Sequence, residues 1–319
     1  MSPQIKPIGR TEIAKHLDVA ALIEPTVAAF KALSAGKSRS HIDVLHPTDH
    51  SDMHVKSAVL DGADIYTVKL AGWSAHNEKA GLPASSGLIL VFSAKTCRPV
   101  AILQDDHLIS DLRTAAAGAV AARELSNKDA RKLGVLGAGE QAGRQIEALR
   151  LVRGIREITI WNRNQDKAEK LADRLKLLDA SLRVHVQETA QAVVEAADIL
   201  VTATASREPL VKAEWLRPGM HITSVGADDA TKCELDPACL LRADLVVVDS
   251  VQAAAQYGNI RRALETRAHS VGQLVEMGKI LAGQAAGRRC RDSITISTFV
   301  GLGVQDLASV MLLRERLDF

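Results

Sequence analysis

Residues 131–152 read RKLGVLGAGEQAGRQIEALRLV. The apolar segment KLGVL leads into a glycine turn, and the residues after the turn have the composition of a helix. Further strand-like segments follow: REITIWN, RVHV, ILVTATA, HITSVGAD and LVVVDS. Helix-like segments lie between the first three of these strands. Strands that alternate with helices of this length are typical of a parallel sheet covered by helices. The sequence therefore predicts an α/β protein with a doubly wound parallel sheet of the Rossmann type.

The glycine turn has the residues that a dinucleotide-binding turn requires. Gly137 allows a tight turn, Gly139 allows the backbone to approach a pyrophosphate, and the small Ala142 allows close packing of helix and strand. The amide groups at the helix start favour a phosphate. A glycine turn can also be purely structural, but its place between a strand and a helix favours dinucleotide binding. We expect cofactor contacts along the whole turn: Gly137, Ala138, Gly139, Glu140, Gln141 and Ala142.

The end of the second strand of this sheet indicates which nucleotide is bound. NAD sites typically carry an acid about 20 residues after the glycines, whereas this strand ends Trp161-Asn162-Arg163-Asn164. An acid there would repel a 2′-phosphate, and Arg163 could pair with one. The alternative is that Arg163 is an ordinary solvated side chain. We expect NADP, with NAD as the second choice, and contacts from Asn162 and Arg163.

Composition excludes several classes of function. The 319 residues suffice for two domains, and 47% of them are hydrophobic. The formal net charge of +2 and the aromatic content of 3% do not suit a nucleic-acid-binding or membrane-binding protein. The chain shows neither a secretory signal nor a long apolar run, so we expect a cytoplasmic location. The four cysteines form no CxxC pair and the histidines have no metal-ligand spacing, so no metal is predicted.

The first third of the chain mixes short elements. Residues 10–35 show helix-like spacing, and Pro25 is expected to open a second helix there. Strand-like runs follow at 53–60, 64–72, 87–94 and 99–105, and an alanine-rich helix begins near Asp111. An amphipathic helix, VQDLASVMLLRERL, ends the chain and could return to pack on this first domain.

Two cationic residues in this part are candidates for binding an anion. Lys69 follows the apolar run DIYTV, and a partly desolvated lysine there could bind a carboxylate or polarise an imine. An ordinary strand-end lysine is equally compatible with the pattern. Arg113 is expected at a helix start, the unfavourable end of the dipole, which indicates an anionic partner. A substrate carboxylate and a neighbouring aspartate are both candidates for that partner.

Polar residues also follow the later strands. Asp228 comes just after HITSVGA, and ligands of doubly wound sheets bind beyond the carboxyl ends of the strands. A carboxylate there could exchange a proton with a substrate amine or imine. Asp229 is a rival for this role, and either residue could instead cap a helix. Residues 202–204, which end the preceding strand, would allow the cofactor to pass closely: Thr202, Ala203 and Thr204.

These motifs together resemble the ornithine cyclodeaminase/mu-crystallin family over essentially the whole chain. The matching stretches include YTVKLAG, GLPASSGLILVFSAKT, SDLRTAAAGAVAA, LGVLGAGEQA, HITSVGAD followed by KCELD, and VGLGVQDLASV. The resemblance implies a homodimer. Residues 1–118 and 304–319 would form a substrate-binding and dimerisation domain, and residues 119–303 would form the dinucleotide-binding domain.

The resemblance also implies roles for individual residues. Asp228 would be the catalytic acid/base. Lys69 is the second expected catalytic residue, and together with Arg113 it would contact the substrate carboxylate. Lys56 and Ser85 are further expected substrate contacts. Additional cofactor contacts are expected from Arg113, Thr114, Val225, Gly226 and Gly301. Members of the family include ornithine and lysine cyclodeaminases, alanine dehydrogenases and reductases of cyclic ketimines, which share hydride exchange at an amino-acid α-carbon.

Two departures from the family pattern affect the substrate site. The family often carries an arginine after the first helices, but here that region reads GKSRSHIDVLHP, with Arg39 as the nearest cation and Asp43 near the expected place. Lys56 stands where methionine is more usual, so it could replace the arginine or bind a second carboxylate. We expect an NAD(P)H-dependent reductase of α-imino acids. The alternatives are a cyclodeaminase with tightly bound NAD and a non-catalytic, NADPH-binding, crystallin-like protein.

Overall fold

The computed structural model describes residues 5–267, 270–317 and 319. The chain forms two compact units, Met1–Arg113 with Leu302–Phe319, and Thr114–Gly301. The predicted boundaries at 118/119 and 303/304 lie a few residues away, inside one helix and just after the first residue of another.

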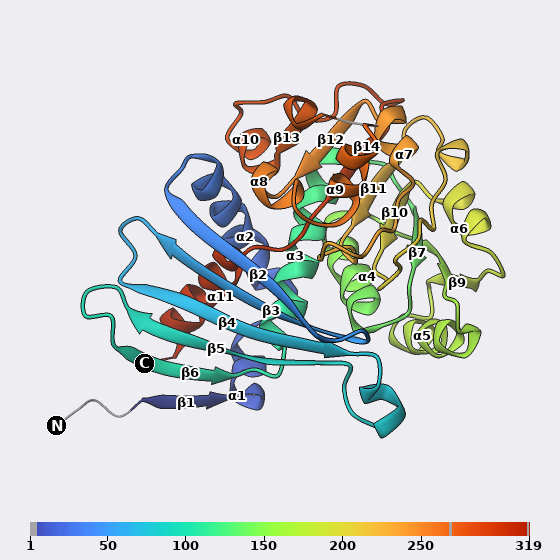
Figure 1. Cartoon of the computed structure of the whole chain (residues 1–319). Coiled ribbons are helices and arrows are strands. Elements are labelled where there is room, and N and C mark those ends of the chain that lie inside the picture. The colour runs from blue at the N-terminus through green and yellow to red at the C-terminus, as the bar shows by residue number, and fades with distance from the viewer. Residues whose placement is uncertain (1–4, 268–269, 318) are drawn as a thin grey trace. The chain divides into compact units, whose positions relative to one another are not determined.

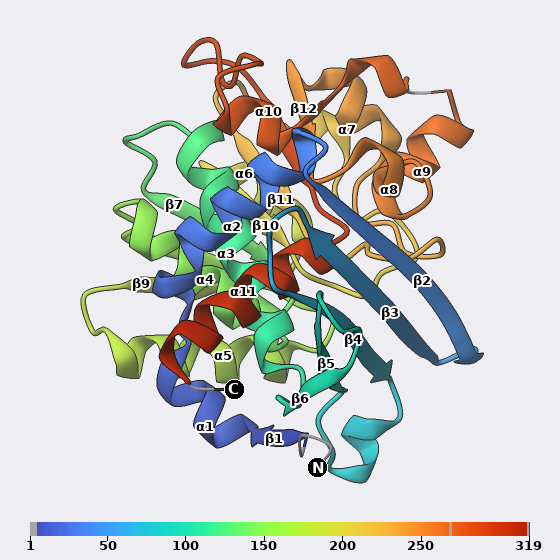
Figure 2. The same cartoon turned by 90° about the vertical axis from the view of Figure 1, so that its left-hand side faces the viewer.

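The first unit contains a six-stranded sheet in the order β1-β6-β5-β4-β3-β2 (Figure 1). Its strands are β1 (Lys6–Gly9), β2 (Ser38–Thr48), β3 (Ser51–Leu60), β4 (Ile65–Ser74), β5 (Ser85–Ser93) and β6 (Pro99–Gln104). All neighbours are antiparallel except β1 and β6. The helices are α1 (Arg10–His16), α2 (Val19–Ser34), α11 (Gly303–Arg316) and the short η1 (Asn77–Ala80). Helices α2 and α11 pack against each other, and α11 contacts β2, β3 and β4 (Figure 2).

Two features of this unit differ from the predictions. Strands β1 and β2 occur where no strand was predicted, because their sequences alternate only weakly between apolar and polar residues. Pro25 lies inside α2 and does not open a helix, so that prediction is wrong. The break between the first two helices falls at Leu17 and Asp18, where the Asp18 side chain accepts a hydrogen bond from the amide of Ala21 at 2.7 Å and caps α2.

The second unit contains an eight-stranded, all-parallel sheet in the order β13-β12-β14-β11-β10-β7-β8-β9. The strands are β7 (Lys132–Leu136), β8 (Glu157–Trp161), β9 (Arg183–Val186), β10 (Ile199–Thr202), β11 (His221–Ser224), β12 (Leu245–Val248), β13 (Leu274–Glu276) and β14 (Thr295–Thr298). Strands β7 to β9 extend in one direction and β10 and β11 in the other, so the order reverses between β7 and β10. This sheet confirms the predicted fold class.

The helices of the second unit connect its strands. They are α4 (Glu140–Val152), α5 (Gln165–Leu178), α6 (Ala190–Ala196), α7 (Pro237–Arg242), α8 (Val251–Ala254), α9 (Gly258–Glu265) and α10 (Met277–Leu281), with the short η2 (Ala213–Trp215) and η3 (Val271–Gln273). Helix α3 (Leu108–Leu125) runs across the boundary between the units. The central strands are buried along their whole length because the sheet is covered on both faces.

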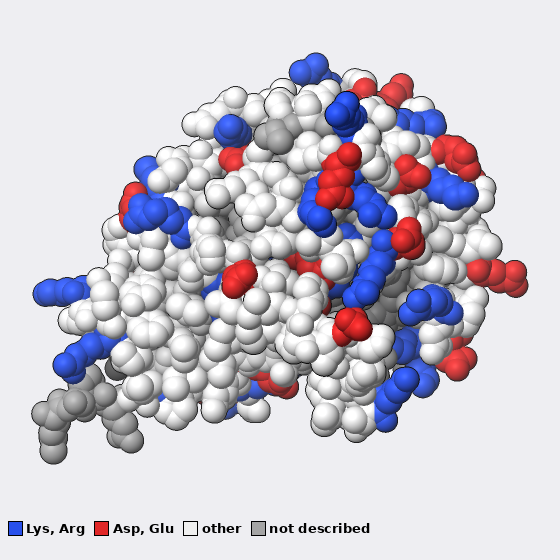
Figure 3. All heavy atoms as spheres, in the orientation of Figure 1, with Lys and Arg blue, Asp and Glu red and all other residues white. Residues whose placement is uncertain are grey.

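Surface charge is mixed. On the face drawn in Figure 3, acidic and basic side chains are interspersed. Of the helices that the structure describes, none combines the length and apolar character needed to cross a membrane.

Candidate functional site

The glycine turn joins β7 to α4. Gly137 has a φ of +116°, its amide donates to the carbonyl of Trp161 at 2.9 Å, and a Cβ placed on it would lie 2.4 Å from the Ala203 carbonyl oxygen. Only glycine fits there, because both the backbone angle and the close approach of residue 203 exclude a side chain. Gly139 differs, since a Cβ there would meet nothing within 4 Å. The packing of the chain therefore does not explain Gly139, whereas the approach of a ligand to its backbone would.

The start of α4 fits a pyrophosphate. Gly139 occupies the N-cap in an extended conformation, and no side chain caps the helix there. An uncapped helix start of this kind suits a phosphate, because the amide groups of a first turn point outward and the helix dipole adds positive potential. Ala142 is fully buried, as the close packing of α4 requires. Glu140 in the first turn forms an ion pair with Arg144 at 2.9 Å.

The carboxyl ends of β10 and β11 are tied together by one buried carboxylate, Glu234. It accepts hydrogen bonds from the hydroxyls of Thr202 and Ser224, from the hydroxyl and amide of Thr204, and from the amide of Gly226, at 2.7–2.9 Å. Burial raises the pKa of Glu234, although these hydrogen bonds oppose the shift. Three of the bonded residues are predicted cofactor contacts, so Glu234 fixes their position. Sequence reasoning did not single out Glu234, although it stands between two apolar residues, Cys233 and Leu235.

Three further predicted cofactor contacts, Val225, Gly301 and Asn162, follow strands at this edge of the sheet, and a fourth, Thr114, lies in α3. The amide of Val225 donates to the Thr202 carbonyl at 3.0 Å. Gly301 has a φ of +79°, and its amide donates to Asp249 at 2.7 Å. Thr114 accepts a hydrogen bond from Gln145 of α4 through its carbonyl at 3.0 Å. Asn162 bonds the backbone of Asn164 at 2.9 Å just after β8.

The structure separates the roles of Asp228 and Asp229. Asp229 is buried, and its Oδ1 accepts hydrogen bonds from the amide and hydroxyl of Thr231 and from the amide of Lys232 at 2.6–2.9 Å. These bonds close a turn, so Asp229 has a structural role and neither aspartate caps a helix. The Asp228 side chain is 32% exposed, and its Oδ1 accepts a hydrogen bond from the Lys232 ammonium at 2.8 Å. Sequence reasoning did not identify Lys232.

In the first unit, Asp306 of α11 brings together two predicted substrate contacts. Lys69 of β4 lies 2.9 Å from Asp306 Oδ2 and donates to the Ser110 hydroxyl at 2.7 Å. The Arg113 Nε donates to Asp306 Oδ1 at 2.9 Å. All of these side chains are buried. Lys69 and Arg113 both pair with the internal carboxylate of Asp306. Such a group can also bind a substrate carboxylate, which would replace some of the contacts that the two cations make with Asp306.

The protonation of this group reflects its burial. Burial, and next the charge of Arg113, lower the pKa of Lys69 to about 8, although Asp306 opposes the shift. Burial alone would raise the pKa of Asp306, but the charges of Lys69, Arg113 and Lys56 hold it below its usual value. Burial raises the pKa of Asp105 to about 6.

The position of Arg113 corrects one prediction. Helix α3 begins at Leu108, so Arg113 lies in its second turn and not at its start. The Asp105 carboxylate accepts a hydrogen bond from the amide of Ile109 at 2.9 Å. It thereby stabilises a helix start that lies earlier in the chain than the predicted one. The predicted anionic partner exists, but it is Asp306, 193 residues away, and not a sequence neighbour.

Lys56 joins the buried group, whereas Arg39 does not. Lys56 of β3 is paired in register with Lys69 and is buried on the same face of the sheet. Arg39 pairs in register with Val59, whose side chain points to the opposite face from Lys56, and forms an exposed ion pair with Asp61 at 3.6 Å. Ser85 pairs with Trp73, four register pairs along the strands from Lys69 and Ile89. It is therefore not in contact with the ion cluster.

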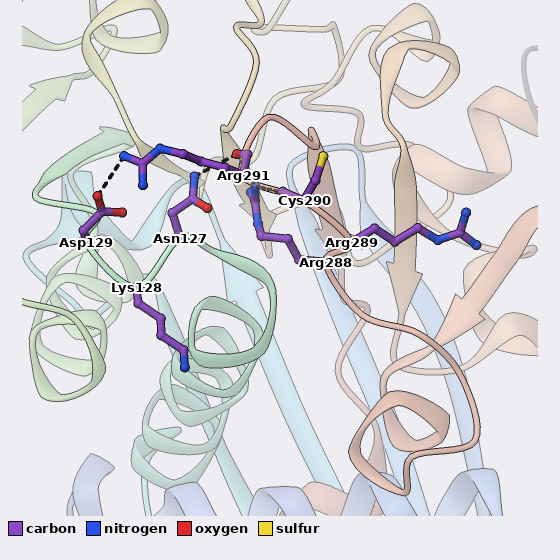
Figure 4. A pocket seen from close by; sticks show the side chains of 7 residues that line it. All are labelled: Asn127, Lys128, Asp129, Arg288, Arg289, Cys290 and Arg291. Atoms are coloured by element: carbon purple, nitrogen blue, oxygen red, sulfur yellow. Dashed lines mark hydrogen bonds and ion pairs between the residues drawn. The ribbon is translucent and has the colours of Figure 1, made fainter.

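A shallow pocket of about 390 Å³ lies elsewhere in the second unit (Figure 4). It is lined by Asn127, Lys128, Asp129, Arg288, Arg289, Cys290 and Arg291. These residues precede β7 and β14, so the pocket lies at the amino ends of the strands, while the glycine turn and Asp228 lie at the carboxyl ends. None of the predicted site residues lines it. Within the described ranges, no three His, Cys, Asp or Glu side chains gather as a metal site would require.

Comparisons with known proteins agree with this arrangement. A sequence profile of the "Ornithine cyclodeaminase/mu-crystallin family" matches residues 8–318. The chain is 37% identical over 300 residues to an uncharacterized cyclodeaminase, y4tK, of Sinorhizobium fredii, covering 93% of this chain and 90% of that one. It is 33% identical over 288 residues to an alanine dehydrogenase of Archaeoglobus fulgidus, covering 90% and 87%.

A solved structure is also similar over nearly the whole length. The Δ1-pyrroline-2-carboxylate reductase of Thermococcus litoralis, in complex with NADH and L-proline, superimposes with a TM-score of 0.92 at 29% identity, covering 98% of this chain and 97% of that one. With the match of the family profile across both units, the chain belongs to the ornithine cyclodeaminase/mu-crystallin family.

Proposed function

We propose that the protein is an NAD(P)H-dependent oxidoreductase that reduces α-imino acids, cyclic or linear, to amino acids. The observation that carries this proposal is the buried pairing of Lys69 and Arg113 with Asp306, because two buried cations gathered around one carboxylate suit a substrate carboxylate. The related reductase of Thermococcus litoralis binds NADH and L-proline, a nucleotide and an amino acid of the kinds proposed here.

The residues of each unit have separate tasks in this proposal. Lys69 and Arg113, with Lys56 beside them, bind and orient the substrate carboxylate in the first unit. In the second, the glycine turn holds the pyrophosphate, and Thr202, Thr204 and Gly226, fixed by Glu234, hold the nicotinamide end. A bound reduced nucleotide supplies the hydride that is added to the α-carbon. Asp228 stabilises and exchanges the proton on the substrate nitrogen.

We further propose a preference for NADP over NAD. Arg163 follows β8, is exposed, and forms no hydrogen bond or ion pair with another described residue, so its guanidinium is available to a 2′-phosphate. The strand end carries no acid that would repel that phosphate. NADH in the Thermococcus litoralis enzyme indicates that the family scaffold also accepts the nucleotide without it.

The outer face of the first unit's sheet supports a homodimer. Apolar side chains cover this face, among them Val55, Tyr66, Val68, Leu70, Leu88, Leu90 and Phe92, and all are half-buried. Tyr66 and Phe92 stack there with ring centroids 5.0 Å apart. An antiparallel sheet that faced water would carry polar residues at these positions, so we assign this face to a second copy of the chain.

The proposed reaction is tested by following NADPH absorbance with purified protein. Δ1-pyrroline-2-carboxylate, Δ1-piperideine-2-carboxylate and pyruvate with methylamine serve as substrates. We expect oxidation of NADPH with at least one of them, and Asp228→Asn should lower kcat by about 10²- to 10⁴-fold while the nucleotide Kd stays within twofold. Release of ammonia from ornithine without any reductase activity would instead identify a cyclodeaminase. Nucleotide binding with neither reaction would identify a non-catalytic binding protein.

A further inference from the structure

Lys232 approaches Asp228, the carboxylate that the proposed function places beside the protonated nitrogen of the substrate. We propose that Lys232 is a positioning residue that holds the Asp228 carboxylate in place and in its ionised form, an inference that rests on the proposed function. Lys232 itself need not touch the substrate, because it acts through Asp228.

A rigid turn places Lys232 beside Asp228. Asp229 Oδ1 accepts hydrogen bonds from the amides of Thr231 and Lys232 and from the Thr231 hydroxyl, and these bonds close the turn. The carbonyl of Asp229 in turn accepts the amide of Gly258 at the start of α9, at 2.8 Å. Gly258 has a φ of +63°, and a Cβ there would lie 2.1 Å from the Ala227 carbonyl oxygen. The backbone on both sides of Asp228 is thereby fixed, and the chain returns with Lys232 pointing toward residue 228.

The Lys232 ammonium bridges two carboxylates of unequal exposure. Its Nζ lies 2.8 Å from Asp228 Oδ1 and 3.5 Å from Asp229 Oδ2. The Lys232 side chain is 11% exposed and that of Asp229 is 2% exposed, whereas Asp228 is 32% exposed. The Asp229 carboxylate is thus buried in the turn that it stabilises. The Lys232 ammonium holds the Asp228 carboxylate through Oδ1, while Asp228 stays accessible to a ligand.

This bridge determines the form in which Asp228 meets a substrate. A cation at hydrogen-bond distance stabilises a carboxylate relative to the carboxylic acid. Asp228 then offers negative charge to a nitrogen that already carries its proton, so the substrate is the protonated imine. On addition of the hydride, a C–H bond forms at the α-carbon, the C=N π electrons become the nitrogen lone pair, and the amine later takes a proton from water. In the reverse direction the Asp228 carboxylate accepts a proton from the ammonium group of the amino acid.

The alternative is that Lys232 only stabilises the turn through Asp229. A double-mutant cycle separates the two roles, because residues that act through one another have non-additive effects. The variants are Lys232→Met, Asp228→Asn and the combination, with Lys232→Arg as the conservative rescue. Lys176→Met is the matched control, since Lys176 forms an i,i+3 ion pair with Asp173 on α5, outside the site.

Steady-state kinetics with Δ1-pyrroline-2-carboxylate, NADPH titration and thermal unfolding are measured for each variant. We expect Lys232→Met to lower kcat by about 10- to 100-fold, with KM, the NADPH Kd and the unfolding midpoint nearly unchanged. Adding it to Asp228→Asn should cause little further loss, Lys232→Arg should restore most of kcat, and Lys176→Met should match the wild type.

The inference is overturned if the two losses multiply, if Lys232→Met keeps full activity, or if it weakens NADPH binding and stability as much as kcat. Failure of the proposed function gives a different result, since the wild type then reduces no imine. Should it release ammonia from ornithine instead, the same cycle measured on that reaction tests Lys232, because the nitrogen proton is exchanged there too.

Discussion

At the scale of single residues, Asp306 is a site residue that local sequence patterns do not reveal. Lys69 and Arg113 could be predicted because each stands in a setting unusual for a cation, an apolar strand and an alanine-rich helix. Asp306 lies 237 residues from Lys69, in an amphipathic helix where one acid is unremarkable. Its role arises only when α11 packs on the sheet that carries Lys69, so no local pattern could reveal it.

The choice between Asp228 and Asp229 was open for a related reason. Both residues follow the same strand, and both satisfy the rule that ligands bind beyond the carboxyl ends of strands. The distinction depends on which carboxylate the backbone of the turn uses, and that depends on the path of residues 229–232. The separate residue types were visible in the sequence, but their hydrogen bonds were not.

Arg163 carries a prediction about nucleotide choice. Arg163→Ala should weaken NADPH binding by about 10- to 100-fold, because one charge-assisted contact with the 2′-phosphate is lost, and should leave the NADH Kd within twofold. Fluorescence titration of both nucleotides measures this. Arg291→Ala, which removes an exposed arginine of the same unit, is the control. An unchanged ratio of the NADPH and NADH affinities would rule out the phosphate contact.

At the scale of elements, prediction succeeded where burial leaves a simple pattern. Strands β7 and β10 are buried on both faces and read as continuous apolar runs, and the helices between strands have clear polar faces. It failed at β2, whose residues alternate between exposed and half-buried positions and include charged side chains. It also failed at Pro25, since the buried apolar face of α2 and its Asp18 cap outweigh the cost of a proline inside the helix.

The glycine turn between β7 and α4 gives a prediction that separates folding from binding. Gly139→Ala should lower the free energy of unfolding by no more than about 1 kcal/mol, because the added Cβ meets nothing in the chain and only the N-cap preference is lost, but should weaken NADPH binding by about tenfold or more by occupying the space of the pyrophosphate. Gly137→Ala is the contrasting variant and should lower the free energy of unfolding by about 2 kcal/mol or more, because of its positive φ and the Ala203 carbonyl.

Urea denaturation and NADPH titration of both glycine variants test this contrast. Equal destabilisation by the two substitutions would show that Gly139 is a structural glycine. Wild-type affinity in Gly139→Ala would show that no ligand approaches this part of the turn.

At the scale of the whole molecule, the chain leaves its first unit within α3 and returns to it with α11. The amphipathic sequence of the last helix suggested such a return, but only the fold shows that this helix delivers Asp306 to the ion cluster. The oligomeric state is harder to predict from sequence, because an apolar residue on a strand can face either the protein core or a second copy of the chain. The register of β3, β4 and β5 assigns these residues to the outer face.

The outer face therefore carries the last prediction. Val68 and its register partner Leu90 lie in the middle of this face, so Val68→Lys should place a charge in the proposed interface. Burying an unpaired charge there costs several kcal/mol, and the variant should be a monomer at concentrations where the wild type is a dimer. Light scattering coupled to size-exclusion chromatography measures the mass.

Leu177→Lys, on an exposed position of α5 in the other unit, is the control and should remain dimeric. Circular dichroism distinguishes a dissociated from an unfolded Val68→Lys variant. A folded Val68→Lys dimer, or a wild-type monomer, would contradict the assignment. The apolar outer face would then have to be covered by something other than a second copy, because a sheet with two apolar faces is not stable against water on one of them.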